Sequence, residues 1–219
     1  KNNPDNLPYL NYRSIRSLLL DENNQTLWYA PWGEGLFKYD FPGKTNQQQL
    51  FNISKKKEES AINCILKKKS GGLICGSFKS VYEVDEKNLS YNFLIKIHCG
   101  VNIFYDSSGK FYWLSTLDGL VQFSDKSIIT KLPVNPDKNK ILYSGGICTE
   151  TNNIYAIYSG VLVETNTASQ KYSLYDFPEK NILLTCICDG KKGNILIGTT
   201  KGIWLFNKQS KKSENTKRI

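Results

Sequence analysis

The side chains that could carry out chemistry are few and widely spaced in this chain of 219 residues. His98 is the only histidine, and it lies in a connecting segment beside Cys99. No serine or cysteine stands in a nucleophile motif such as the Gly-x-Ser-x-Gly elbow. A lone histidine in such a segment is usually structural. We therefore predict no catalytic residue, no cofactor and no enzymatic activity for this chain.

Acidic side chains occur mainly where the sequence predicts turns. Five aspartates share this setting: Asp21, Asp85, Asp106, Asp118 and Asp189. An aspartate at a turn accepts hydrogen bonds from nearby backbone N–H groups, and this role explains all five positions. Two facing carboxylates would instead cleave a glycosidic bond, so a propeller glycosidase stays open as an alternative.

The six cysteines match positions that are otherwise apolar. Four fall in the first strand of a repeated unit described below, one in a second strand and one in a connector: Cys64, Cys148, Cys186 and Cys188, then Cys75, then Cys99. We predict small buried hydrophobic residues rather than disulfide partners. Two thiols on one face of a strand, as in Cys186-Ile-Cys188, bridge poorly and form an incomplete metal site, so no metal is predicted. Free thiols need burial in an exported protein, which argues mildly against export.

The chain carries a formal net charge of +9, and only Arg13, Arg16 and Arg218 among its 29 basic residues are arginines. Lysine clusters lie at 55–57, 67–69, 191–192 and 211–212, all in predicted turns or in the tail. Nucleic-acid recognition would require basic residues that converge on one groove, with arginine and aromatic side chains among them. We therefore predict solvated loops and no nucleic-acid partner, although such a field would attract an acidic glycan.

One aromatic residue stands apart from the others. Trp28, Trp113 and Trp204 fall inside predicted strands, where packing explains them. Trp32 lies in the turn Pro31–Gly35, where packing requires no large ring, and it could stack on a sugar. The predicted ligand-binding residues share this rim: Trp32, Tyr29, Glu34, Phe78, Lys79 and Tyr158.

A repeated unit positions these residues. The stretch Asn194–Asn207 contains two short β-rich runs joined by a link with Gly202, which is the pattern of a hairpin. The same pattern occurs five times, with the turn residue spaced by 45, 39, 41 and 42 residues: Gly35, Ser80, Gly119, Gly160 and Gly202. A period near 42 with three or four strands per copy predicts an all-β fold of β-propeller blades with four antiparallel strands.

The repeats predict a propeller segment over residues 1–207 and five blades, at about 13–53, 60–95, 100–132, 143–175 and 182–207. The basic tail 208–219 shows no strand pattern and is predicted to be disordered. Blade five then lacks its fourth strand unless residues 7–12 supply it. Because an open edge invites association, we favour part of a larger array over a closed five-bladed ring. No run of 18 apolar residues occurs, so no membrane span is predicted.

The repeat resembles a known family on specific residues. Copy five carries the pattern most fully in Gly193–Thr199 and Gly202–Asn207, and copies one and three share it at Gly35–Asp40 and Asp118–Leu120. This pattern resembles the two-component regulator propeller repeat. Copies two and four depart from it, because Cys75-Gly-Ser77 and Tyr158-Ser159 replace the Gly-Thr pair, and copy two also has Ser80 in place of the turn glycine.

The resemblance implies the periplasmic sensor region of a hybrid two-component histidine kinase of the Bacteroides type, an inner-membrane protein that responds to oligosaccharides. The partners it implies are an oligosaccharide ligand, the remaining propeller blades and kinase parts of a parent chain, and a second copy in a homodimer. Two alternatives stay open: a stand-alone propeller scaffold that binds protein, and a propeller lyase or glycosidase.

Overall fold

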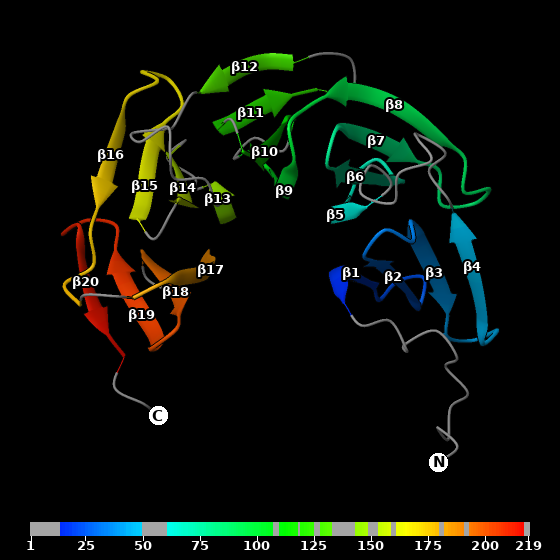
Figure 1. Cartoon of the computed structure of the whole chain (residues 1–219), viewed down its shortest axis with the longest axis horizontal. Helices are drawn as coiled ribbons and strands as arrows, with labels where there is room; N and C mark the ends of the chain where they lie inside the picture. Colours follow the sequence, from blue (N-terminus) through cyan, green and yellow to red (C-terminus); the bar gives the residue numbers. More distant parts are fainter. Residues whose placement is uncertain are drawn as a thin grey trace. The chain divides into compact units, whose positions relative to one another are not determined.

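The computed structural model describes residues 14–49, 61–106, 110–117, 119–124, 128–132, 143–148, 153–158, 161–179, 182–190 and 193–216. The strands form five antiparallel sheets of four strands each (Figure 1). The chain divides into two compact units, Lys1–Lys96 with the first two sheets and Ile97–Ile219 with the other three. The predicted all-β fold of four-stranded antiparallel blades is confirmed, and we number the sheets as blades 1 to 5.

The strands follow one another in order within each blade. The first unit contains β1 (Ile15–Asp21), β2 (Thr26–Pro31), β3 (Leu36–Asp40) and β4 (Thr45–Gln49) in blade 1, and β5 (Ile62–Lys67), β6 (Leu73–Ser77), β7 (Ser80–Val84) and β8 (Tyr91–Lys96) in blade 2. The second unit contains β9 (Gly100–Tyr105), β10 (Tyr112–Thr116), β11 (Gly119–Phe123) and β12 (Ile128–Leu132) in blade 3, β13 (Tyr143–Cys148), β14 (Asn153–Tyr158), β15 (Val161–Asn166) and β16 (Tyr172–Tyr175) in blade 4, and β17 (Leu184–Asp189), β18 (Asn194–Thr199), β19 (Gly202–Asn207) and β20 (Lys212–Asn215) in blade 5.

Central strands are buried on both faces, because blades stack face to face within each unit. All five residues of β6 and of β10 are buried. A strand buried on both sides reads as a nearly continuous apolar run rather than as an alternating one. Outer strands such as β4, with the sequence Thr-Asn-Gln-Gln-Gln, are polar, and polar edges discourage pairing with other chains.

Every blade carries the same irregularity near the start of its first strand. A register shift separates Ile15 from Ser17 in β1, and equivalent shifts occur in the other four blades. The repeated bulge aligns the blades residue by residue. In this alignment one central position of the second strand is equivalent in all five blades. From blade 1 to blade 5 it holds Trp28, Ile74, Trp113, Tyr155 and Leu196.

These central residues lie on the same face of every blade, which we call its trailing face, and within each unit this face packs against the following blade. In the first unit Trp28 and Leu36 of blade 1 pack against Cys75 and Tyr82 of blade 2. In the second unit Trp113 of blade 3 packs against blade 4 in the same way. Blade 4 then packs its own trailing face, with Tyr155 and Leu162, against the apolar residues of blade 5. The prediction that Trp28, Trp113 and Trp204 serve packing is confirmed by their burial.

The antiparallel order places two kinds of connection at opposite ends of each blade. Loops between second and third strands lie at one end, the loop end, and turns between first and second or third and fourth strands lie at the other, the turn end. At the turn end, an Asp or Asn side chain accepts backbone N–H bonds after the third strand in four blades: Asp40, Asp85, Asn166 and Asn207. This geometry explains the Asp or Asn that follows the aromatic residue in the repeat.

The predicted turn role of the other aspartates holds only in part. Asp106 accepts hydrogen bonds from the backbone of Lys110 and Phe111 at 3.0 and 3.1 Å. Asp21 accepts a backbone hydrogen bond from Asn24 and also pairs with Lys67, Asp189 forms an ion pair with Lys208, and Asp118 lies outside the described residues. An acidic residue at the end of a strand can therefore also reach a neighbouring cation.

The tail prediction differs from the structure. Residues Lys212–Asn215 form β20, the fourth strand of blade 5, which pairs with β19 from Trp204 to Asn207. The expectation of a disordered tail without a strand is therefore wrong for these residues. Residues 7–12, the alternative source of a fourth strand, lie outside the described part of the chain.

The cysteine prediction is also only partly right. Cys64, Cys75 and Cys99 are buried and form no disulfide, whereas Cys186 and Cys188 are exposed. The exposed pair lies on the trailing face of blade 5, which no other described sheet of the second unit covers. The side chain of Cys148 lies outside the described residues.

Cysteine and glycine are matched across two of the blades. Cys186 pairs with Gly198 in blade 5 as Cys64 pairs with Gly76 in blade 2, and a Cβ atom on Gly198 would lie 2.4 Å from the Cys186 Sγ atom. We expect Gly198→Ala to lower the free energy of unfolding by about 1 kcal/mol, because the thiol must move aside. Cys186→Ala in the same chain should remove that loss, as measured by urea denaturation. An equal loss with and without Cys186 would contradict the pairing.

Candidate functional site

An arginine and two aromatic rings meet at the loop end of the first unit. The Arg16 Cζ atom lies 4.2 Å from the centre of the Trp32 ring, and the Phe78 ring makes a T-shaped contact with Trp32 at a centroid distance of 5.3 Å. Trp32 belongs to the loop of blade 1, and Phe78 belongs to the equivalent loop of blade 2. We call Arg16, Trp32 and Phe78 the Arg–Trp cluster.

The loop that carries Trp32 is one residue longer than its counterpart in blade 2. Seven residues separate the paired Tyr29 and Phe37 of blade 1, whereas six separate Cys75 and Tyr82 of blade 2. Gly33 and Gly35 have φ angles of 73° and 83°, a region that favours glycine. The backbone N–H of Trp32 donates to the Ser14 carbonyl at 3.0 Å, so the extra residue is held against the start of β1.

Arg16 is an exposed cation. It occupies an outward position of β1, next to the bulge at Ile15 and Ser17. Within the described ranges it makes no hydrogen bond or ion pair, and its contact is the Trp32 ring. A guanidinium over an indole ring is held by cation–π attraction, worth about 0.5–1 kcal/mol at an exposed site.

The structure brings some of the predicted ligand-binding residues together and separates others. Trp32 and Phe78 are in contact, and Glu34 and Lys79 lie in the same two loops. Tyr29 is only 3% exposed, since it stacks on Phe37 and its hydroxyl donates to the Asn46 side chain. Tyr29 is therefore a buried residue of the sheet and not part of an accessible rim.

Two further points concern the predicted site. Tyr158 ends β14 in the second unit, and its side chain lies outside the described residues. Arg16 was not predicted, although the sequence carries a signal for it. Arg16, Leu18 and Leu20 alternate along one face of the predicted strand, and Arg16 is the charged member of this series. A charged residue in an otherwise apolar series marks a position that packing does not explain.

The turn end of the same unit contains a cavity of about 810 Å³ between blades 1 and 2. A network of charged groups lies in and beside it. Lys67 lies 2.5 Å from Asp21 and 2.7 Å from Glu86, and Lys38 donates to the Glu86 carbonyl at 3.0 Å. Because Lys67 binds a carboxylate from each blade, Asp21 of blade 1 and Glu86 of blade 2, we interpret this network as a structural link between the two blades.

The pKa shifts agree with a structural link. The hydrogen bond from Lys67 lowers the pKa of the Asp21 carboxyl, against the opposing effect of burial. Burial lowers the pKa of Lys67, but the hydrogen bonds to Asp21 and Glu86 outweigh it and raise the pKa overall. Both shifts favour the charged forms, so the pair stays ionised at neutral pH.

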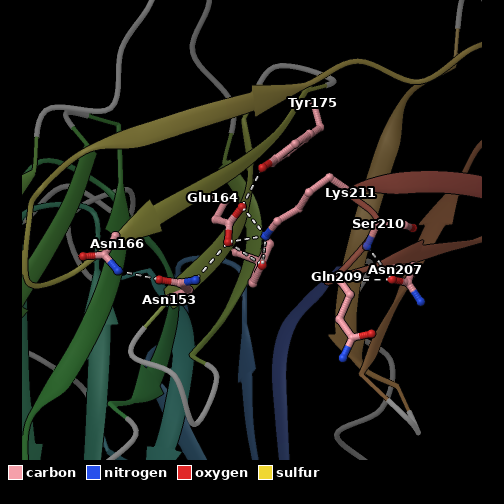
Figure 2. A network of polar contacts seen from close by, with 9 residues as sticks. Asn153, Glu164, Asn166, Tyr175, Asn207, Gln209, Ser210 and Lys211 are labelled. Carbon is pink, nitrogen blue, oxygen red and sulfur yellow. Dashed lines mark hydrogen bonds and ion pairs between the residues drawn. The ribbon is translucent and has the colours of Figure 1, made fainter.

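A second buried network joins blades 4 and 5 (Figure 2). The Glu164 carboxylate accepts hydrogen bonds of 2.6 Å from the hydroxyl groups of Tyr155 and Tyr175, and the Lys211 Nζ atom lies 2.6 and 2.7 Å from its two oxygens. The Asn153 side chain donates a further bond at 2.9 Å. With every carboxylate oxygen occupied by protein groups, this network is a clamp between blades.

The described residues offer no cluster of three or more His, Cys, Asp and Glu side chains able to hold a metal ion. His98 is exposed in the connector, where its backbone carbonyl accepts a hydrogen bond from Leu117 at 3.1 Å. Across those same residues, no helix is long and apolar enough to cross a bilayer.

No family model and no curated protein matches this sequence. Solved structures do match. The extracellular domain of BT3049 from B. thetaiotaomicron, assigned to a hybrid two component system, has a TM-score of 0.72 and 17% sequence identity over 93% of this chain. That of BT4673 from the same organism, with the same assignment, has a TM-score of 0.71 and 16% identity over 94% of this chain.

The chain has a β-propeller fold. It spans about 30% of the length of these two extracellular domains. A streptogramin B lyase matches equally well in fold, with a TM-score of 0.72 and 10% identity over 92% of this chain and 68% of its own. The TM-scores establish a shared propeller architecture. Because the sequence identities are this low, function has to be argued from the site.

Proposed function

We propose that this chain is an extracytoplasmic, ligand-binding propeller segment of a hybrid two-component histidine kinase, and that its ligand is an oligosaccharide. The Arg–Trp cluster carries the proposal, because an indole ring in a loop at the end of a blade suits stacking on a sugar. Likeness in fold to two extracellular domains assigned to such systems supports the sensor role. The segment is non-catalytic in this proposal, and kinase activity belongs to other parts of the parent protein.

The parent protein would also supply the next blade. The apolar residue that follows the loop on the trailing face is at most 1% exposed in blades 1 to 4, at Leu36, Val81, Leu120 and Leu162, whereas Ile203 of blade 5 is 53% exposed. An apolar sheet face of this kind fits a further blade. A homodimer through the same face is the alternative.

Light scattering on the chain and on Ile203→Glu separates these two cases. A dimer that Ile203→Glu converts to a monomer would favour the homodimer. A monomer whose Cys186 and Cys188 react with maleimide, but are protected in the longer parent protein, would support a further blade.

The periplasmic location has a test of its own. A membrane-impermeant maleimide applied to intact cells would label an engineered surface cysteine of a periplasmic segment.

Ligand binding is tested by replacing Trp32. On an array of defined plant and animal oligosaccharides, followed by calorimetry on the glycans bound, Trp32→Ala should weaken binding roughly tenfold or more, since a central aromatic contact contributes about 2 kcal/mol. Phe41→Ala is the matched control, because Phe41 is an exposed aromatic residue at the turn end of the same blade. Failure to bind any glycan, or equal binding by Trp32→Ala, would count against the proposal.

A propeller lyase is the second candidate, because lyase propellers share the fold. A virginiamycin B lyase from Staphylococcus aureus is described as catalytically inactive when one of its histidines is replaced by alanine. The only histidine of this chain is His98. Turnover of quinupristin that His98→Ala abolishes would favour the lyase.

A further inference from the structure

The cations of this chain differ in how they are satisfied. Lys67 and Lys211 each form an ion pair with a carboxylate of the neighbouring blade, and Lys68 forms one with Glu83 of its own blade. Arg16 forms none in the part of the chain that the structure describes, and it is exposed. A guanidinium has five N–H donors, so Arg16 retains its donors for an external acceptor.

Trp32 restricts where that guanidinium can be. With Cζ 4.2 Å from the ring centre, the Arg16 side chain is held on the indole, and Trp32 is itself held by Phe78 and by the hydrogen bond to Ser14. A cation held in place loses less rotamer entropy when it binds than a free side chain does. Arginine also presents paired N–H groups that match the two oxygens of a carboxylate or sulfate.

We propose that Arg16 on Trp32 binds an anionic group of the ligand, a uronate carboxylate or a sulfate ester, so that the oligosaccharide recognised is an acidic glycan. This inference rests on the proposed function. The net charge of +9 attracts anions toward the protein. A neutral sugar offers hydroxyl oxygens as acceptors, but it lacks the negative charge and the paired oxygens that give a charge-assisted, bidentate contact with a guanidinium.

The test uses ¹⁹F NMR on the chain labelled with 5-fluorotryptophan, with the Trp32 resonance assigned from Trp32→Phe. The probes are tetragalacturonic acid, its carboxyl-reduced neutral derivative, a chondroitin sulfate tetrasaccharide, and sodium sulfate against sodium chloride at matched ionic strength. We expect at least one acidic tetrasaccharide to shift the Trp32 resonance and to bind at least tenfold more tightly than the neutral derivative. We also expect Arg16→Gln to weaken that binding by roughly ten- to hundredfold. Lys44→Gln, at the turn end of blade 1, is the charge-matched control.

The outcomes separate this inference from the proposed function. Equal binding of the neutral and acidic tetrasaccharides, unchanged in Arg16→Gln, would overturn the anion site and leave oligosaccharide binding supported. A Trp32 shift with sulfate that Arg16→Gln removes, without binding of any tetrasaccharide, would support the anion site and count against an oligosaccharide ligand. No Trp32 shift with any probe would overturn the anion site.

Discussion

Trp28→Ala is expected to lower the free energy of unfolding of the first unit by about 3–5 kcal/mol. Trp28 is completely buried on the trailing face of blade 1, where it packs against Leu73, Cys75 and Tyr82 of blade 2. Removal of the ring deletes the largest side chain of this interface and leaves a cavity that two sheets cannot close without shifting. Urea denaturation followed by circular dichroism measures the loss.

The repeat provides matched comparisons for this substitution. Trp113 occupies the same position in blade 3 and is equally buried, so Trp113→Ala should cost a similar amount in the second unit. Leu196 occupies it in blade 5, where the side chain is only half-buried, so Leu196→Ala should cost about 1 kcal/mol. Equal losses at Trp28 and Leu196 would contradict the view that blade stacking, rather than the strand position itself, stabilises this residue.

Much of the fold could be predicted because the same local sequence features recur in the repeats. Each second strand is largely apolar on both faces, and in four of the five blades an Asp or Asn at the end of the third strand accepts hydrogen bonds from the turn after it. Both features are visible in Asn194–Asn207 and again in Leu73–Asp85. Strand β20 gave no such signal. Its residues Lys-Ser-Glu-Asn lie largely exposed, so backbone pairing with β19 defines the strand, and no apolar pattern marks it.

The candidate site was less predictable, because it depends on contacts between blades. A large ring in the turn Pro31–Gly35 identified Trp32, and Phe78 followed from the equivalent loop. Tyr29 was misplaced, because its direction is set by the pairing of Tyr29 with Leu18 and Phe37, a register that the turn alone does not fix. Arg16 was missed for a similar reason, since its contact with Trp32 joins β1 to a loop 16 residues further along the chain.

Glu164→Ala is the second substitution with a large expected effect. The carboxylate is mostly buried and binds Lys211, Tyr155 and Tyr175, so its removal leaves a cation and two hydroxyl groups without their acceptor (Figure 2). Breaking a buried ion pair by removing one partner costs about 3–5 kcal/mol. Because Lys211 is about one-third exposed, we expect about 2–3 kcal/mol.

Two variants control for this loss. Glu179→Ala breaks the exposed pair with Lys201, and it should cost about 0.5 kcal/mol or less. Glu164→Ala combined with Lys211→Met removes the unpaired cation as well, so it should be more stable than Glu164→Ala alone. A double variant at least as unstable as the sum of the two single variants would contradict the clamp.

The same network predicts how stability depends on pH. Burial raises the pKa of Glu164, but hydrogen bonds from Lys211, Tyr155 and Tyr175 outweigh it and lower the pKa overall. The clamp therefore contributes fully to the free energy of unfolding above the ordinary glutamate pKa, and this contribution is lost as the pH falls through the lowered pKa of the folded state.

At the alkaline end, burial and the hydrogen bond to Glu164 raise the pKa of Tyr175 to about 12. The folded state binds that proton more tightly than the unfolded chain, so stability is lost as the pH rises from the ordinary tyrosine value toward 12. Urea denaturation across pH should show both losses in the native sequence and weaker ones in Glu164→Ala, whereas identical pH profiles would show that Glu164 is not the titrating centre of the clamp.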